Sequence, residues 1–399
     1  MLNTMSKHSL PDLALFGGTP LFAEKRFVGR PNLAPTDEIL ADMRQILDQR
    51  WLSNDGPYLK GFEAMLCQSL GVKHCIAVSN GTIGLELLIR ALNLTGEVIV
   101  PSFTFIATVH ALQWLGLTPV FCDILPETHT LNPQSVAALI SPRTSAILGV
   151  HLWGLPCEIP ALEALAEQHG LKLIFDAAHA LLCEYHGRKL GNFGHAEVFS
   201  FHATKFVNSL EGGAITTNDD ALAERLRLMR NFGFVDYDQV EALGINAKMN
   251  EVCAAVGQSS LRHSADFIAH NRSNYWLYQK QLTQIPGLKL LSLPESSNFQ
   301  YLVLALEPTE FGLSRDRLVQ LLHAENLIAR RYFYPGCHRS KPYAQLYPEA
   351  GERLPITEAL TEKVLLLPTG TAVSAEMIEA IGELLGFIQT HAAFIQAAV

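Results

Sequence analysis

The sequence predicts an α/β protein built on a mostly parallel sheet between helices, followed by a smaller C-terminal α/β domain. From about residue 75, short apolar runs rich in β-branched residues alternate with segments of helical period, over about 140 residues. Such alternation is typical of a parallel sheet covered by helices on both faces. After about residue 265 longer amphipathic helical patterns replace it. This change of pattern indicates a second domain.

Seven strands and four intervening helices are expected in the first part. The strands are Cys75–Ser79, Val98–Pro101, Thr118–Asp123, Ala146–Val150, Leu173–Asp176, Val198–Phe201 and Ala214–Thr217. The helices are Thr82–Leu92, Thr104–Leu115, Pro133–Ile140 and Pro160–His169. Because ligands bind at the carboxyl ends of strands in open parallel sheets, the residues that follow these strands are the candidates for function.

The second domain is expected to hold three helices and at least two strands. The helices are Asn271–Leu282, Ser314–Glu325 and Ser374–Gln389, and the strands are Phe299–Leu306 and Ala329–Tyr334. We therefore divide the chain into a large domain, 1–265, and a small domain, 266–399. The first 60 residues, rich in Gly and Pro, are expected to form an arm of the large domain that lies over other structure.

The composition is that of an ordinary globular protein. The 399 residues are 48% hydrophobic and 17% charged, with a net charge of −9 and no block of Lys or Arg, so no nucleic-acid partner is expected. The uncharged stretch Val98–Cys122 is long enough to span a membrane, but Pro101 and Pro119 divide it into strand, helix and strand. Seven cysteines without a C-x-x-C pair, and no signal-peptide pattern, make the cytoplasm the expected compartment.

Four segments at the ends of expected strands together indicate a site for a phosphorylated aromatic cofactor. Ser79-Asn80-Gly81-Thr82 opens a helix, where free N–H groups and the helix dipole suit a phosphate; a plain helix cap is the alternative. Phe105 follows the next strand, where its ring can stack on a cofactor or fill the core.

The third segment holds two further candidates, Asp176 and His179. Asp176 ends a buried strand, where an unpaired carboxylate is costly and a protonated pyridine nitrogen would supply the missing cation. The alternatives are a helix cap for Asp176 and a hydrogen-bonded core histidine for His179.

The fourth segment places Lys205 between a buried strand and the turn Glu211-Gly212-Gly213. Partial burial lowers the pKa of a lysine and frees its amine to attack a carbonyl. A solvated surface lysine is the alternative.

Together these residues resemble the DegT/DnrJ/StrS sugar aminotransferase family, whose members are pyridoxal-phosphate enzymes of fold type I. The resemblance rests on Ser-Phe-His-Ala-Thr-Lys at 200–205, Glu-Gly-Gly-Ala at 211–214 and Asp-Ala-Ala-His at 176–179. It extends over nearly the whole chain through Asn-Asp-Gly-Pro at 54–57, Gly-Ile-Asn-Ala-Lys-Met-Asn-Glu at 244–251, Pro-Gly-Cys-His at 335–338 and Leu-Pro-Thr-Gly-Thr at 367–371.

The resemblance implies the catalytic roles. Lys205 would form the internal Schiff base with pyridoxal 5'-phosphate and, once displaced by the amino donor, move the proton of the 1,3-shift. Asp176 would keep the pyridine nitrogen protonated, so that the ring stays an electron sink. His179, where many relatives carry Gln, would hydrogen-bond the phenolic oxygen of the cofactor.

The resemblance also implies how the cofactor is held. Phe105 would stack on one face of its ring and Ala178 on the other. Its phosphate would be bound by Gly81, Thr82 and Ser200, and by Asn246 of the neighbouring subunit. The active unit would therefore be a homodimer.

The substrates follow from the same resemblance. L-Glutamate is the expected donor, and the 4-keto carbon of dTDP-4-keto-6-deoxyglucose is the expected acceptor, giving dTDP-4-amino-4,6-dideoxyglucose. The turn Glu211-Gly212-Gly213 resembles members that aminate a 4-keto carbon. Weaker candidates for substrate binding, each as readily structural, are Asn54, Lys248, Tyr332 and His338. We assign no metal.

Three other functions compete with this one. An aminotransferase acting at a 3-keto carbon, or on a cyclitol ketone, would keep the same cofactor site. A non-catalytic sensor on the same fold would keep the pocket but would not need the lysine. A nicotinamide dehydrogenase is excluded, because it needs a G-x-G-x-x-G turn and no G-x-G occurs in the chain.

Overall fold

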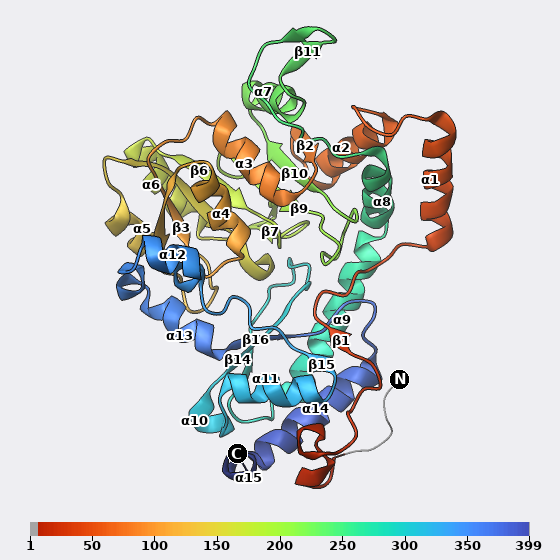
Figure 1. Cartoon of the computed structure of the whole chain (residues 1–399), viewed down its shortest axis with the longest axis vertical. Helices are drawn as coiled ribbons and strands as arrows, with labels where there is room; N and C mark the ends of the chain where they lie inside the picture. The colour runs from red at the N-terminus through yellow and green to blue at the C-terminus, as the bar shows by residue number, and fades with distance from the viewer. Residues whose placement is uncertain (1–6, 399) are drawn as a thin grey trace.

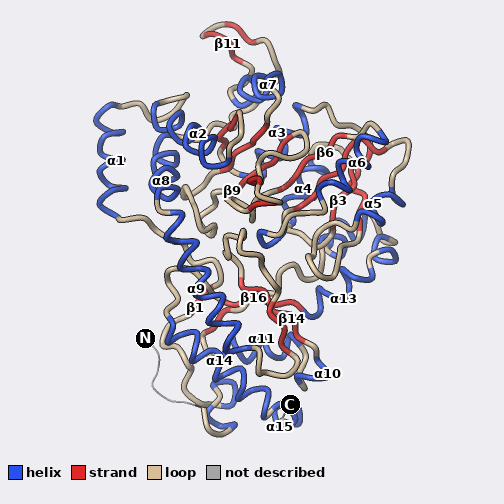
Figure 2. The backbone as a smooth tube through the Cα atoms, turned by 180° about the vertical axis from the view of Figure 1, so that it is seen from behind, coloured by secondary structure: helices blue, strands red, loops and turns tan. Residues whose placement is uncertain are grey.

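The computed structural model describes residues 7–398, which form a larger and a smaller lobe. In Figures 1 and 2 the long helix α9 (Ser264–Leu282) runs from the larger lobe into the smaller one. The first described residues also lie on the smaller lobe, where Leu13 and Phe22 are buried. The Glu325 carboxylate accepts hydrogen bonds from the backbone N–H groups of Ala14 and Leu21, at 2.7 and 2.6 Å.

A seven-stranded sheet forms the centre of the larger lobe, in the order β2-β10-β9-β6-β5-β3-β4. Neighbours are parallel, except that β10 runs antiparallel to both β2 and β9. The seven expected strands are confirmed to within two residues at each end. They are β2 (His74–Val78), β3 (Glu97–Pro101), β4 (Thr118–Cys122), β5 (Thr144–Val150), β6 (Lys172–Asp176), β9 (Ala196–Ser200) and β10 (Gly213–Thr217).

Helices cover both faces of this sheet, because its strands bury apolar side chains on both sides. Along β2, Ile76 and Val78 join one core cluster while Cys75 and Ala77 join the other. The first cluster is completed by α3 (Gly81–Ala91), α4 (Ile106–Trp114) and α7 (Asp220–Arg230). The second is completed by α2 (Pro57–Leu70), α5 (Pro133–Leu139), α6 (Ile159–His169) and α8 (Glu251–Arg262). The four expected helices of this part are thus confirmed to within two residues.

The uncharged stretch Val98–Cys122 folds as expected, into strand β3, helix α4 and strand β4. Across residues 7–398, no helix combines the length and the apolar character needed to cross a bilayer.

The smaller lobe holds an antiparallel sheet with the strand order β13-β14-β16. Its strands are β13 (Leu288–Leu290), β14 (Leu302–Leu306) and β16 (Val364–Leu367). The expected helices appear as α9, which begins seven residues earlier than predicted, α11 (Arg315–Ala324) and α14 (Ala375–Thr390). Further helices of the smaller lobe are α10 (Pro308–Phe311), α13 (Pro355–Lys363) and α15 (Ala392–Ala397), while α12 (Lys341–Leu346) packs against the larger lobe through Tyr343.

Two expectations for the smaller lobe are corrected. The strand predicted over Phe299–Leu306 begins only at Leu302, because Phe299 has a left-handed φ of 51° that interrupts an extended run. The strand predicted over Ala329–Tyr334 is wrong: the strand there is β15 (Leu327–Ile328), and the chain turns after it. Phe333 instead stacks on Trp153, with ring centroids 5.1 Å apart, so its apolar character serves packing between the lobes.

The remaining elements are one further helix and several short strands. They are α1 (Thr36–Gln49), which packs on α8, the pair β1 (Arg26–Phe27) with β15, and the hairpins β7 (Glu184–Tyr185) with β8 (Arg188–Lys189) and β11 (Phe234–Asp236) with β12 (Gln239–Val240). The division into 1–265 and 266–399 stays a proposal. Helix α9 crosses it, since Phe267 packs with the larger lobe while Tyr275 and Tyr278 pack with the smaller one.

Candidate active site

The three predicted catalytic residues lie together at the carboxyl ends of the central strands. Asp176 is the last residue of β6, His179 lies on the loop that follows it, and Lys205 lies on the loop after β9. Asp176 and His179 are only 7% and 8% exposed. Since β6 and β9 are parallel neighbours, the fold brings these loops to one edge of the sheet, as predicted.

Asp176 is a buried carboxylate whose hydrogen bonds come from neutral groups. The Thr108 hydroxyl donates to Oδ2 at 2.7 Å, and the backbone N–H of Ala178 donates to Oδ1 at 3.0 Å. Burial raises the pKa of Asp176 even though these donors, and the charge of Lys205, act to lower it. A carboxylate in this state is suited to a cationic N–H brought by a ligand.

Lys205 faces this carboxylate from the neighbouring loop. Its Nζ donates to the hydroxyl of Tyr301 at 3.1 Å. Burial lowers the pKa of Lys205 to about 8, although the charge of Asp176 acts in the opposite direction. The amine is therefore neutral in part of the molecules near neutral pH, as a nucleophile or proton acceptor must be.

His179 is held between aromatic rings. Trp153 stacks on it with centroids 5.5 Å apart, and Tyr301 lies 4.4 Å away on a tilted plane. Burial and the charge of Lys205 lower the pKa of His179 well below its usual value, so the imidazole is neutral. The backbone N–H of Trp153 points at Nδ1 from 3.4 Å, which assigns the ring proton to Nε2. His179 is therefore a hydrogen-bond donor at Nε2, as the predicted role requires.

The predicted phosphate site is formed where α3 begins beside the end of β9. A methyl group added to Gly81 would lie 3.3 Å from Cβ of Ser200, so these two residues are in close approach. Asn80 caps the helix by accepting from Ile83 N–H at 2.9 Å, and the N–H groups of Gly81 and Thr82 belong to the first helical turn, which has no intrahelical acceptor. Asn80 can thus cap the helix while the N–H groups of Gly81 and Thr82 stay available for a phosphate.

Phe105 does not fill the core. Its side chain is 55% exposed at the start of α4, and it lines a cavity of about 310 Å³ together with Tyr332. Arg330 and Arg331 line the same cavity, and the Arg330 guanidinium lies 4.8 Å from the centre of the Tyr332 ring. Two arginines and two aromatic rings therefore line one cavity, in which Arg330 lies over the Tyr332 ring and Arg331 donates to Asp316 at 3.0 Å.

Asn246 and Lys248 lie on a segment beside the end of β2, and Lys248 shares a cavity with Asn54. The carbonyl of Ala247 accepts from Ser79 N–H at 2.9 Å, which places this segment against the end of β2, while the Asn246 side chain is exposed. Lys248 donates to Asn231 Oδ1 at 2.9 Å. Lys248 and Asn54 line one cavity of about 530 Å³. The structure thus brings these two weak candidates together.

His338 is occupied by other partners. It is buried, with Nδ1 2.6 Å from the Ser102 hydroxyl and Nε2 2.6 Å from a Glu358 carboxylate oxygen. In this arrangement neither ring nitrogen is free for a substrate, and the contacts attach the loop of the smaller lobe to the end of β3.

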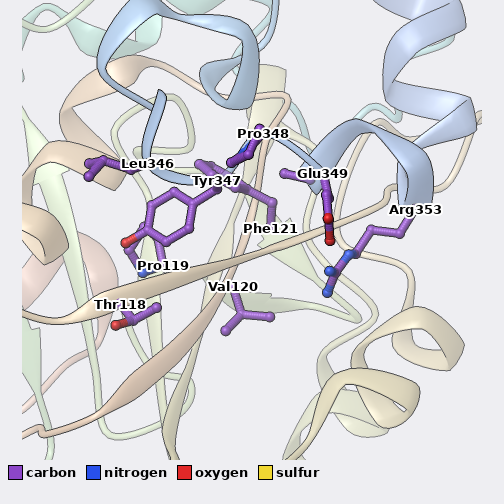
Figure 3. Close-up of a pocket in the computed structure, with 10 residues that line it drawn as sticks. Thr118, Pro119, Val120, Phe121, Leu346, Tyr347, Pro348, Glu349 and Arg353 are labelled. Atoms are coloured by element: carbon purple, nitrogen blue, oxygen red, sulfur yellow. The ribbon is translucent and has the colours of Figure 1, made fainter. Parts of the chain in front are cut away.

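A further cavity of about 410 Å³ opens beside the edge strand β4 (Figure 3). None of the residues singled out from the sequence lines it. Its charged lining residues are Glu349 and Arg353, which lie on the same side of the cavity in Figure 3. Among the residues that line it, no nucleophilic side chain lies beside a buried acid or base, so this cavity is not a candidate active site.

Three residues of the site were missed from the sequence. Thr108, which donates to Asp176, lies within α4, and only the register of that helix reveals it. Trp153 comes three residues after the end of β5, so the rule that strand ends carry function could have found it. Tyr301 comes from the smaller lobe and has no local signal.

Comparison with known proteins gives matches over nearly the whole chain. Residues 34–385 match the DegT/DnrJ/EryC1/StrS aminotransferase family. The chain is 37% identical to a dTDP-4-amino-4,6-dideoxy-D-glucose transaminase of Shigella dysenteriae, covering 89% of this chain and 96% of the relative. It is 38% identical to the erythromycin biosynthesis sensory transduction protein EryC1 of Saccharopolyspora erythraea, covering 84% and 90%. The solved structure of DesI in the presence of its TDP-sugar product has a TM-score of 0.92 and 45% identity, covering 98% and 99%.

The lowered pKa of Lys205 predicts its reactivity in protein freed of cofactor. We expect its labelling by an amine-selective reagent to have a midpoint near pH 8, because burial disfavours the ammonium form. An ordinary lysine has its midpoint at about pH 10.4. Peptide mass spectrometry over a pH series gives the midpoint, with the exposed Lys60 in the same samples as internal reference. A Lys205 midpoint near that of ordinary lysine would contradict this account of the site.

Proposed function

The chain belongs to the DegT/DnrJ/EryC1/StrS aminotransferase family, and from this premise we propose that it transfers an amino group from L-glutamate to the 4-keto carbon of dTDP-4-keto-6-deoxyglucose. The family and its named relatives make the protein a sugar aminotransferase. The proposal adds the donor, the acceptor and pyridoxal 5'-phosphate as the cofactor. The product would be dTDP-4-amino-4,6-dideoxyglucose.

The observation that carries the proposal is the buried pair formed by Asp176 and Lys205. Asp176 has a raised pKa and only neutral hydrogen-bond donors, which suits the protonated ring nitrogen of pyridoxal phosphate. Lys205 has a lowered pKa, which suits an amine that bonds to an aldehyde. Gly81 and Ser200 lie in close approach at a helix N-terminus, which suits the phosphate. These residues fit the cofactor at three separate points.

The roles of the residues follow from this fit. When bound, pyridoxal phosphate supplies an electron sink that stabilises negative charge on the carbon beside the reacting nitrogen. Asp176 holds the positive charge at the ring nitrogen, and His179 donates from Nε2 to the phenolic oxygen. Lys205 Nζ, as a neutral amine, takes the proton from the α-carbon of the donor and returns it to complete the shift. Phe105 and Ala178 would hold the ring of the cofactor.

Two observations support the nucleotide-linked keto sugar. The relative from Shigella dysenteriae is named for dTDP-4-amino-4,6-dideoxy-D-glucose, and DesI was solved with a TDP-sugar product. In this chain, Arg330 and Arg331 line the cavity of Phe105 and Tyr332, which therefore offers cations for a diphosphate and aromatic rings for a base.

A cofactor-binding sensor is the second candidate, because the relative EryC1 bears the name of a sensory transduction protein. A sensor would need the pocket but not a reactive lysine. The lowered pKa of Lys205 therefore favours the enzyme.

We further propose that the active unit is a homodimer in which Asn246 completes the phosphate site of the partner. Large apolar side chains are exposed along two segments, 40–52 and 232–245. Exposed apolar surface of this kind is typical of an interface, and we propose that a second copy of the chain covers it. The exposed side chains include Leu40, Leu47, Trp51, Phe232 and Leu243. The hairpin β11–β12 of the second segment projects from the larger lobe (Figure 1).

The compartment we propose is the cytoplasm. All seven cysteines are free, and five of them are buried. Burial raises the pKa of Cys183 and of Cys337 to about 12, so these thiols are unreactive, and a set of unpaired thiols suits a reducing compartment.

The product of the reaction tests the function. Purified protein is incubated with pyridoxal phosphate, L-glutamate and dTDP-4-keto-6-deoxyglucose, and the product is identified by mass spectrometry and NMR. We expect an amino group at the 4-position and no product with Lys205→Ala. If glutamate converts the cofactor to pyridoxamine phosphate but no amino sugar forms, the assignment as an aminotransferase would stand and dTDP-4-keto-6-deoxyglucose would be rejected as the acceptor. Failure of both steps would make the sensor the leading candidate.

Mixed dimers test the role of Asn246. If Asn246 acts across the interface, dimers formed from Lys205→Ala and Asn246→Ala chains contain one intact site. Co-expression should then restore about a quarter of the wild-type activity, since half of randomly assembled dimers are mixed and each has one intact site of two.

The matched control for this experiment is the pair Lys205→Ala and Asp176→Asn. These two residues face each other within one chain, so no mixed dimer of this pair has an intact site. Rescue in the control, or none with Asn246→Ala, would contradict an active site shared in the proposed way.

A further inference from the structure

We propose that Tyr301 is a positioning residue for Lys205, holding its amine in the orientation that proton transfer requires. The inference rests on the proposed function, in which Lys205 carries the proton. The Tyr301 hydroxyl lies 3.1 Å from Nζ of Lys205. Tyr301 precedes β14 of the smaller lobe while Lys205 follows β9 of the larger lobe, so this hydrogen bond joins the two lobes at the reacting group.

The ring of Tyr301 has little freedom to move. It is buried, lies 4.4 Å from the His179 ring, and meets Trp153 edge-on at 5.4 Å. These contacts fix the direction of the phenol oxygen. An oxygen fixed by packing loses little conformational entropy when it binds an amine.

The backbone before Tyr301 is attached to the loop that carries His179. The side chain of Asn298, fully buried, donates to the carbonyl oxygens of His179 and Leu181 at 2.9 and 3.1 Å. Its Oδ1 accepts from Gln300 N–H at 3.0 Å. Asn298 therefore fixes the distance between the segment that carries Tyr301 and the loop after β6 that carries His179.

The phenol can bind the amine in both protonation states. Burial raises the pKa of Tyr301 far above its usual value, so the hydroxyl stays protonated at every pH at which the enzyme works. It accepts a hydrogen bond from the ammonium form of Lys205 and donates one to the neutral amine. Lys205 can thus take up and release a proton without losing its orientation. A group that acts first as proton acceptor and then as proton donor needs this property.

Other charged or titratable groups also face Lys205. They are Asp176 from β6, His179 from the following loop, and Arg30 from the N-terminal segment, which lines a small cavity together with Lys205 and Tyr301. A variant that removes only the hydroxyl leaves all of these in place, so the pH dependence of Lys205 reports on Tyr301 alone.

Tyr301→Phe is the direct test, because it removes the hydroxyl and keeps the ring that packs on His179 and Trp153. In cofactor-free protein we expect the labelling midpoint of Lys205 to fall by about one unit, because the buried ammonium loses an oxygen acceptor. In the loaded enzyme we expect kcat to fall about tenfold or more, with KM for the keto sugar within about twofold, because orientation and not substrate binding is lost.

Tyr278→Phe is the matched control. Tyr278 is also buried in the smaller lobe, but its hydroxyl donates to the carbonyl of Pro368 at 3.0 Å and not to Lys205. A purely structural role of buried hydroxyls would affect both variants alike. We expect the Lys205 midpoint and kcat of the control to match the wild type.

A midpoint and a kcat in Tyr301→Phe that equal those of Tyr278→Phe would overturn the proposal. The labelling experiment needs neither cofactor nor sugar, so it decides the role of Tyr301 even if the proposed acceptor is wrong. Conversely, an active wild type with an unaffected Tyr301→Phe would reject Tyr301 and leave the proposed function standing.

Discussion

A carboxylate and an amine buried opposite one another are the constraint on which the site depends. Burial raises the pKa of Asp176 and lowers that of Lys205, so the charged form of each is disfavoured unless a partner is supplied. A ligand that brings a cationic N–H to one and an aldehyde to the other relieves both costs together. This is why a parallel sheet with two charged groups at adjacent strand ends suits pyridoxal phosphate.

The second feature that shapes the site is that both lobes build it. The larger lobe supplies the acid, the amine and the residues proposed to bind the phosphate, while the smaller lobe supplies Tyr301, Phe333 and the two arginines of the cavity that Phe105 also lines. Asn298 and His338 attach the smaller lobe to the ends of β6 and β3. Relative movement of the lobes would therefore change the geometry at Lys205.

The sequence predicted best what depends on local chemistry. Buried strands were found because their apolar runs are continuous. Asp176 and Lys205 were found because a charged residue at the end of such a strand, or on the loop that follows it, is unusual. Residues 329–334 were mistaken for a strand, because an aromatic-rich segment that packs between lobes has the same composition as a strand. Tyr301 and Thr108 could not be found, since their roles depend on how distant segments meet. For His338 the sequence left a structural and a substrate-binding role open, and its contacts with Ser102 and Glu358 favour the structural one.

The charge of Asp176 is the most direct point at which to test this account. Asp176→Asn keeps the size of the side chain and one oxygen, which can accept from the Ala178 N–H, and it removes the negative charge. Its amide nitrogen takes the place of the oxygen that accepts from Thr108, whose hydroxyl can turn to accept instead. Asp123→Asn, at another buried carboxylate that binds the start of α13, is the control. The measurement is the single-turnover rate of amino transfer from L-glutamate to the bound cofactor. The account predicts a loss of at least about a hundredfold for Asp176→Asn alone, and a rate within about twofold of wild type would contradict it.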